Sequence, residues 1–268
     1  MIGDIVIPDA EHRAQPDRPQ KSDDYRKIQQ KLISTVGAIC IGIPLMAYLV
    51  NTQSACFSDS ISHFYYRALW GDIFVMALAV AGVLLIVFRS DTGIFDHAAF
   101  VAGLLLLIVA LVPTGGSGCA SGSQSMEARA FFAYDAAADC AEEAVCEEPV
   151  TAELEFEGFA PAFIHKAAAI AYLVLLFVLC TFGFTRITDE DKIGGKVVRA
   201  KRIRNAIYRL CGAFMAGAML FYVASKLGLT SVEHPTFWVE FIALIAFGVA
   251  WLVKGRVFSQ MLKSPREA

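Results

Sequence analysis

Three histidines stand in parts of the chain that could meet at one end of a folded protein. His63, His165 and His234 are separated by long apolar stretches. Acidic residues lie near each of them: Asp59, Asp72, Glu157 and Glu240. Neutral imidazoles with one or two carboxylates are the usual ligands of zinc, and three protein ligands leave a position open for an activated water molecule. The pattern predicts a zinc site at His63, His165 and His234, a polar pocket without metal, or histidines bound only to water and backbone.

Ionisable residues near the ends of the apolar stretches extend this hypothesis. Because burial of a charge in lipid is costly, such residues are expected to face the interior of a helix bundle or to reach the headgroups. An Asp72–Lys166 or Glu240–Lys166 ion pair would lower the cost of burial. Asp72 and Glu240 are the candidates for a catalytic base if the protein is an enzyme. The whole predicted pocket consists of His63, Asp72, His165, Lys166, His234 and Glu240.

Other classes of function lack their motifs. The chain has no dinucleotide fingerprint, phosphate loop or nucleophile elbow, and no basic face with aromatic residues for nucleic acid. Ser60 and Ser62 lie close to His63, but proximity in sequence does not aim a serine at a base. No charged residue falls in the middle of an apolar stretch, which argues against a proton relay or an ion pathway through a membrane.

The elements that must position these residues are membrane-spanning helices. Of the 268 residues, 56% are hydrophobic and 18% are charged, whereas soluble proteins carry about 25% charged residues. A helix needs about 20 mostly apolar residues to cross a bilayer. Six charge-free runs reach or approach this length: Leu32–Val50, Ile73–Phe88, Ala98–Val112, Ala167–Phe184, Leu210–Ala224 and Phe241–Val253. They predict an all-α fold, a polytopic bundle of six transmembrane helices within residues 32–255.

Basic residues predict how this bundle is oriented, because Lys and Arg are retained on the cytoplasmic side. They are concentrated in residues 1–31, in the loop 187–209 and in the tail 256–268. The alternate loops hold one basic residue each: Arg67, Arg129 and Lys226. We therefore expect both termini in the cytoplasm, a disordered N-terminal tail without a signal peptide, and the three histidines at the outer face.

The largest predicted feature outside the membrane is the loop 114–161, which begins rich in Gly and Ser and ends strongly acidic. Such charge runs usually stay solvated and extended; a lid and a docking surface for a cationic protein partner are the alternatives. Four cysteines fall on the same side: Cys56, Cys119, Cys140 and Cys146. In an oxidising space they could form two disulfides. We favour Cys140–Cys146 with Cys56–Cys119 over the other two pairings and over free thiols.

Three stretches carry a resemblance to a known family: Ser60–Val75, Val112–Thr114 and Trp238–Gly255. Over residues 32–255 the chain resembles small multi-pass proteins of the bacterial inner membrane, which implies that location without naming a reaction. Ser60, His63 and Asp72 are also similar to the first part of the pattern of the CREST superfamily of membrane metallohydrolases, which includes alkaline ceramidases. The chain departs from that pattern in its six predicted helices, where the superfamily has seven, and in lacking His-x-x-x-His near its C-terminus.

Two functional hypotheses follow from these observations. The first is a non-enzymatic inner-membrane protein that binds a lipid, a small molecule or a partner at its outer face. The second is a zinc-dependent hydrolase that acts on a lipid in the outer leaflet, with the three histidines as ligands. Metal content separates the two hypotheses.

Overall fold

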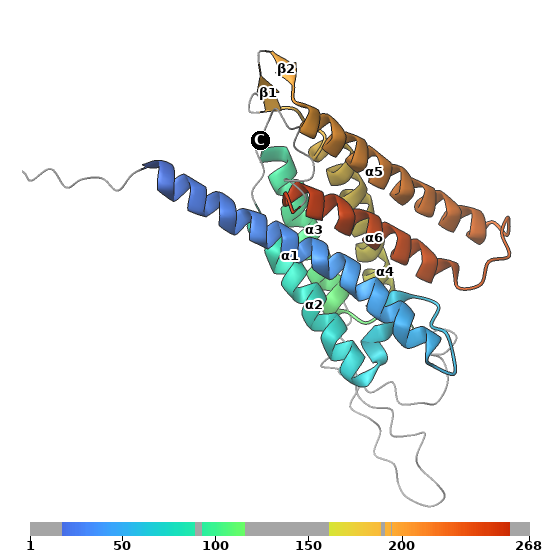
Figure 1. Cartoon of the computed structure of the whole chain (residues 1–268). Helices are drawn as coiled ribbons and strands as arrows, with labels where there is room; N and C mark the ends of the chain where they lie inside the picture. The colour runs from blue at the N-terminus through green and yellow to red at the C-terminus, as the bar shows by residue number, and fades with distance from the viewer. Residues whose placement is uncertain (1–17, 89–92, 116–160, 189–190, 194, 258–268) are drawn as a thin grey trace, which may run out of the picture.

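The computed structural model describes residues 18–88, 93–115, 161–188, 191–193 and 195–257, and six long α-helices dominate it (Figure 1). They are α1 (Arg18–Thr52), α2 (Ala68–Val87), α3 (Gly93–Leu111), α4 (Pro161–Val178), α5 (Arg199–Lys226) and α6 (Pro235–Lys254). The shorter elements are the 3₁₀-helix η1 (Ile61–Tyr66), the π-helix η4 (Leu179–Gly183) and two antiparallel strands, β1 (Lys192–Ile193) and β2 (Lys196–Val197). The predicted all-α fold is confirmed.

All six helices are long and apolar enough to cross a membrane. Each helix coincides with one of the six apolar runs, although the runs of α2 and α3 continue one residue past the helix and the run of α4 continues through η4 to Phe184. Polar or aromatic flanking residues extend the shorter runs to spanning length. The protein is therefore a multi-pass membrane protein. α1 begins at Arg18, so the helix continues through residues that the sequence assigns to the N-terminal tail. α5 likewise begins at Arg199 and takes in the second half of the predicted loop 187–209.

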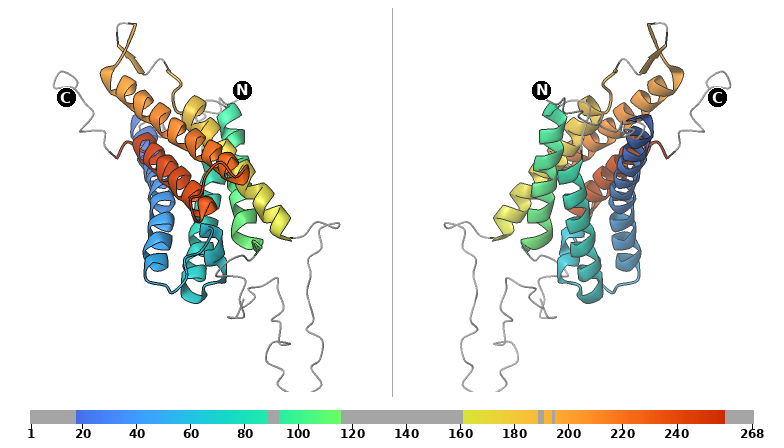
Figure 2. Two further views of the ribbon diagram at one scale, coloured as in Figure 1. Left: turned by 90° about the vertical axis from the view of Figure 1, so that its right-hand side faces the viewer. Right: turned by 90° about the vertical axis from the view of Figure 1, so that its left-hand side faces the viewer.

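Each helix packs against the helices before and after it in the chain. α6 also packs against α1, so the six helices form a closed bundle. η4 continues α4 and brings it into contact with α5. One end of the bundle, here called the η1 end, carries η1, the end of α3 and the starts of α4 and α6. The opposite end, here called the hairpin end, carries the β1–β2 hairpin, as the three views show (Figures 1 and 2). The three predicted histidines are therefore brought to one end of the molecule.

Glycines allow two pairs of helices to approach closely. A Cβ atom added to Gly103 of α3 would lie 2.5 Å from the carbonyl oxygen of Gly82 on α2, and one added to Gly248 of α6 would lie 2.9 Å from that of Gly37 on α1. Such small-residue contacts are typical of membrane helices. On α5, small residues at four-residue spacing, Gly212 with Ala216 and Ala213 with Gly217, predict close packing of the same kind. Gly212 faces Thr181 in such a contact, whereas Gly217 has open space beside it.

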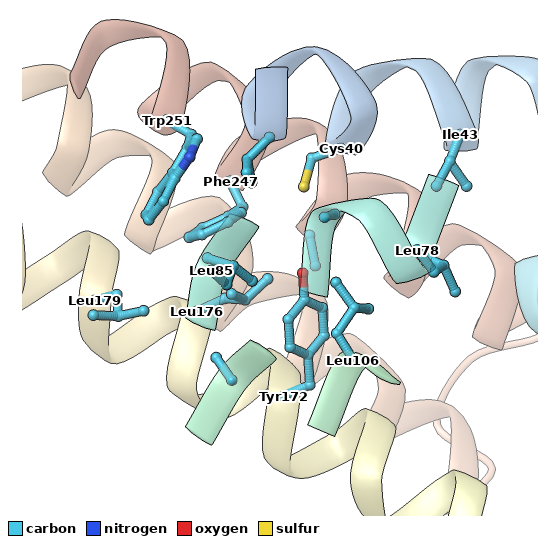
Figure 3. Close-up of a cluster of buried hydrophobic side chains, with 14 of the residues drawn as sticks. Cys40, Ile43, Leu78, Leu85, Leu106, Tyr172, Leu176, Leu179, Phe247 and Trp251 are labelled. Atoms are coloured by element: carbon cyan, nitrogen blue, oxygen red, sulfur yellow. The ribbon is translucent and has the colours of Figure 1, made fainter. Parts of the chain in front are cut away.

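The middle of the bundle is an apolar core (Figure 3). Leu85, Leu176 and Trp251 are fully buried there, and the Tyr172 hydroxyl points toward Cys40. Within the described residues, buried polar and charged side chains gather at the two ends. Those at the η1 end are Asn51, Ser58, Ser60, Ser62, His63 and His165, and those at the hairpin end are Asp191, Lys201 and Asn205.

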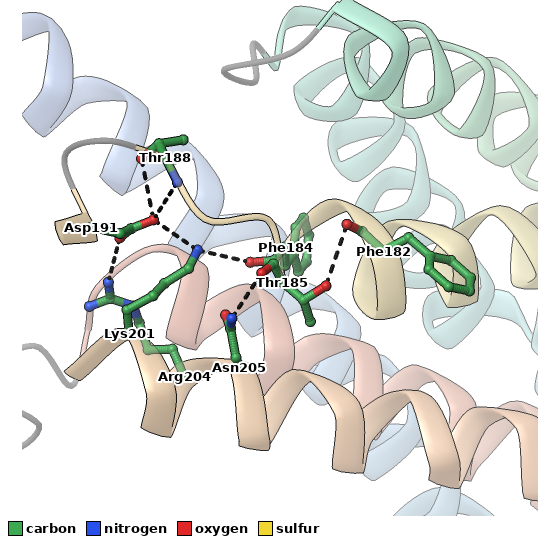
Figure 4. Close-up of polar contacts among 8 residues, drawn as sticks. All are labelled: Phe182, Phe184, Thr185, Thr188, Asp191, Lys201, Arg204 and Asn205. Atoms are coloured by element: carbon green, nitrogen blue, oxygen red, sulfur yellow. Dashed lines mark hydrogen bonds and ion pairs between the residues drawn. The ribbon is translucent and has the colours of Figure 1, made fainter. Parts of the chain in front are cut away.

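At the hairpin end, the buried charges hold the end of the α4–η4 helix against α5 (Figure 4). Lys201 Nζ donates to the carbonyl of Phe184 (3.3 Å) and pairs with Asp191 (3.2 Å). Asn205 donates to the carbonyl of Thr185 (2.8 Å). The last carbonyls of a helix have no partner within it and carry its negative dipole end. Lys201 and Asn205 therefore complete the end of this helix.

The pH dependence of stability should report on this cluster. Burial opposes ionisation of Asp191, but hydrogen bonds from Thr188 and the nearby Lys201 ammonium outweigh it and lower the pKa of Asp191. A carboxyl with a lowered pKa stabilises the fold fully above its ordinary pKa, and this stabilisation is lost as the pH falls through the lowered value. We expect the melting temperature in detergent to fall across that acidic range. In an Asp191→Asn variant this part of the acid dependence should disappear; an unchanged profile would contradict the assignment.

Candidate functional site

The η1 end is built on a short helix that a carboxylate anchors. Ser60 caps η1 by accepting a hydrogen bond from the backbone N–H of Ser62 (3.0 Å). Its hydroxyl lies within 3.0 Å and 2.8 Å of the two carboxylate oxygens of Glu240 on α6, and the N–H of Ile61 donates to the same carboxylate (2.7 Å). The first N–H groups of a helix have no partners within it. Glu240 therefore joins η1 to α6.

A second contact fixes the start of α6 to the same connection. The N–H of Phe237 donates to the carbonyl of Asp59 (2.9 Å), and Nδ1 of His234 lies 2.6 Å from the Asp59 carboxylate. The His234 ring also stacks on Phe57, with 4.9 Å between ring centroids. His234 adopts a left-handed backbone conformation with φ of 53°, which is costly for a residue other than glycine. These contacts hold it in that conformation.

Arg67 organises the polar residues between α1 and η1. Its guanidinium donates to the hydroxyls of Ser54 (2.7 Å) and Ser58 (3.1 Å) and lies 3.5 Å from Oδ1 of Asn51. The N–H of Ser58 donates to the same Asn51 oxygen (3.2 Å). A further contact reaches the carbonyl of Cys56 (3.4 Å). Through these side-chain and backbone acceptors, Arg67 joins the end of η1 to the end of α1 and the residues that follow it.

Residues 112–115, which follow α3, lie between η1 and the start of α4. Nδ1 of His165 lies 2.7 Å from the carbonyl oxygen of Val112, and the Tyr66 hydroxyl donates to the carbonyl of Thr114. Burial, with the neighbouring Tyr65, raises the pKa of Tyr66 to about 12, so its hydroxyl stays protonated and can donate. Side chains from two elements therefore hold this extended segment.

His63 contacts the same segment from η1. The backbone of Gly115 lies near its ring. Burial lowers the pKa of His63; the charge of Asp59 and the Gly115 backbone oppose this effect, and the charge of Arg67 adds to it. A lowered pKa leaves the imidazole neutral at pH 7. A neutral imidazole has one N–H donor and one nitrogen that can only accept.

The second nitrogen of each buried imidazole has no hydrogen-bond partner. These atoms are Nδ1 of His63 and Nε2 of His165, in residues that are 5% and 2% exposed. The two rings are close enough to interact electrostatically. Leaving a buried polar atom unpaired costs about 1–3 kcal/mol, and such atoms are uncommon in native proteins. Nδ2 of Asn51, at the same end, is also buried and without a partner, and together these atoms mark a place where a ligand could be bound.

The structure brings together part of the predicted pocket. His63, His165 and Glu240 lie in the interior of the η1 end, whereas Asp72 and Lys166 lie at the same end with exposed side chains. Among the described residues, Glu240 bonds to Ser60 and Ile61 and no ion pair joins it to Lys166. His234 bonds to Asp59 instead of turning to the other two histidines.

A metal centre of three histidines is not formed in the described part of the chain, where no three His, Cys, Asp or Glu residues are placed to hold one ion. Zinc binding stays a prediction. Cys119, Cys140 and Cys146 lie outside the described residues, as do Glu157 and nearly all of the loop 114–161. The disulfides and a protein partner at that loop therefore stay predictions as well. Cys40, Cys180 and Cys211 are buried free thiols.

Sequence reasoning missed the contribution of the backbone to this site. The carbonyls of residues 112–115 and the Tyr66 hydroxyl carried no sequence signal, because any residue supplies a carbonyl. Arg67 did have a sequence signal, because it is the only Lys or Arg between the first two apolar runs. Comparison of the chain with protein-family models, curated proteins and solved structures gives no match.

Proposed function

We propose that this membrane protein binds a polar small molecule or a lipid headgroup at its η1 end. The observation that carries the proposal is a pair of buried imidazoles with unpartnered nitrogens: Nδ1 of His63, and Nε2 of His165, whose other nitrogen bonds to the Val112 carbonyl. A bound polar group would supply the missing partners. Four other buried polar residues lie at the same end of the bundle: Asn51, Ser58, Ser60 and Ser62.

Retention of lipid by the purified protein tests this proposal. We would measure, by native mass spectrometry, which phospholipids remain bound after extraction from a defined mixture, for the unsubstituted chain and for a His165→Phe variant. The expected result is one retained polar molecule that the variant loses. His97→Phe is the matched control, because His97 also contacts a carbonyl through Nδ1 (2.6 Å to Gly93) but is exposed at the hairpin end. Equal retention by all three proteins would contradict the proposal.

The proposal includes an orientation in the bacterial inner membrane, with the η1 end outside and both termini in the cytoplasm. Exposed basic residues near the hairpin end support it: Arg186, Lys192, Lys196, Arg199 and Arg202. Lys and Arg are retained on the cytoplasmic side, where they meet anionic lipid.

Labelling of engineered cysteines measures this orientation. In intact cells, we expect a membrane-impermeant thiol reagent to modify Ser231→Cys, in the exposed connection between α5 and α6, and to leave Lys196→Cys on β2 unmodified. The unsubstituted chain corrects for native thiols. Permeabilised cells should show both sites modified. The reverse pattern in intact cells would invert the map and place the imidazole pair inside.

A zinc-dependent lipid hydrolase is the second candidate, favoured by the presence of two neighbouring imidazole nitrogens without partners. A catalytic zinc site needs three protein ligands, so this candidate requires a further ligand to approach His63 and His165. Elemental analysis of the purified protein decides between the two candidates. Stoichiometric zinc that is lost in both His63→Ala and His165→Ala supports the hydrolase. Bound lipid without stoichiometric metal supports the binding protein.

A further inference from the structure

One face of α5 is turned to the outside of the bundle and carries a row of positive charges. α5 packs against α6, η4 and α4, and residues such as Lys201 and Tyr208 are buried on that side. Arg199, Arg202 and Arg209 are exposed. Residues seven apart lie two turns apart on the same face of a helix. Arg202 and Arg209 therefore stand one above the other on the outer face.

These three arginines have no acidic partner among the described residues. Asp191 lies beside the same helix but is paired with Lys201 and Arg204, and α5 itself contains no Asp or Glu. Arg199 and Arg202 are also three residues apart in the first turn, where like charges repel each other and the positive end of the helix dipole. An anion over this face would offset both repulsions.

The position of Arg209 along α5 places its guanidinium at the depth of the phospholipid phosphates. Lys226 ends α5 at the opposite surface and is exposed. About 20 helical residues cross the hydrocarbon core, and counted back from Lys226 they reach Ala206, so the backbone of Arg209 lies just inside the core. Side chains lean toward the N-terminus of their helix, and a long arginine follows this direction to the headgroups. Beyond Arg209 the same face is apolar, with Ala213 and Leu220 exposed.

We propose that this outer face of α5 binds an anionic phospholipid, with its phosphate held by Arg202 and Arg209 and an acyl chain along the apolar residues that follow. The site lies at the hairpin end, away from the η1 end, and so goes beyond the proposed function. Guanidinium groups bind phosphate through paired N–H donors. A lipid of net negative charge compensates the unpaired arginines, whereas a zwitterionic lipid brings its own cation. The charged row with an apolar continuation fits a phospholipid better than a soluble anion.

Competition between two phospholipids with the same acyl chains tests the inference. Phosphatidylglycerol carries a net negative charge, and phosphatidylcholine has the same phosphate but is zwitterionic. We would measure, by native mass spectrometry, which of them the full-length chain retains from nanodiscs that hold equal amounts. The unsubstituted protein should prefer phosphatidylglycerol. Arg202→Gln or Arg209→Gln should lower this preference by about fivefold, and the double variant by about twentyfold.

Lys226→Gln is the matched control, because it removes an exposed positive charge from the other end of the same helix and should leave the preference unchanged. His165→Phe should also leave it unchanged, which separates this site from the one proposed at the η1 end. Equal retention of the two lipids by the unsubstituted protein overturns the inference, and this comparison does not depend on the folding of a variant. A preference that the double variant keeps, or that Lys226→Gln lowers as much as Arg209→Gln does, overturns it as well.

Discussion

Replacing Lys201 by methionine is expected to lower the free energy of unfolding by about 3 kcal/mol. Removal of one partner of a buried ion pair costs about 3–5 kcal/mol, because the other charge stays buried without compensation. The side chains of Lys201 and Asp191 are 9% and 12% exposed. Arg204 remains 3.4 Å from the carboxylate, which places the expected loss at the lower end of that range. Unfolding of the detergent-solubilised protein measures the effect.

The control for this substitution is Lys196→Met, which removes an exposed lysine from the neighbouring strand β2 and should change stability by less than about 0.5 kcal/mol. A double variant, Lys201→Met with Asp191→Asn, should recover part of the loss, since it removes the uncompensated charge. If Lys201→Met costs no more than the 0–1 kcal/mol typical of a surface pair, the cluster does not hold α4 and η4 to α5.

The second large effect is expected for Glu240→Ala. This change leaves the Ser60 hydroxyl and the Ile61 N–H without their acceptor, and each such buried group costs about 1–3 kcal/mol. It should also release η1 from α6 and, with it, the position of His63. We therefore expect both a lower melting temperature and weaker retention of the ligand at the η1 end.

Two control variants make this result specific. Glu240→Gln keeps a carbonyl oxygen as acceptor and should retain more of the stability than Glu240→Ala. Glu233→Ala removes an exposed carboxylate just before α6 and should have little effect. Equal stability of Glu240→Ala and the unsubstituted protein would show that the carboxylate does not anchor η1.

The six helices could be predicted from sequence because lipid imposes a length and an apolar composition on each span. Their ends could not. α5 begins at Arg199, well before its apolar run, since Lys and Arg are good helix formers and the helix continues beyond the hydrocarbon. The π-helix at the end of α4 also left no sequence signal, although Lys201 and Asn205 bind the carbonyls of the two residues that directly follow it.

The candidate site could be predicted only in outline. Alternation of the spans places His63, His165 and Glu240 at one end, and the structure confirms this. Which groups pair there depends on the path of the connection between α1 and α2. In that connection Asp59 reaches His234, and the start of η1 presents Ser60 and Ile61 to Glu240. Spacing along the chain could not predict the 3₁₀-helix that sets these directions.

The most direct test of the account is the protonation of the two buried imidazoles. The chain has five histidines, and ¹⁵N NMR of histidine-labelled protein, with signals assigned through His63→Phe and His165→Phe, reports which nitrogen of each ring carries the proton. We predict a neutral His63 ring at pH 7 and a proton on Nδ1 of His165, which faces the Val112 carbonyl, and we expect the signals of both rings to change when the retained molecule is removed. A doubly protonated His63 ring, a His165 ring without a proton on Nδ1, or signals that removal of the retained molecule leaves unchanged would contradict the proposed binding site.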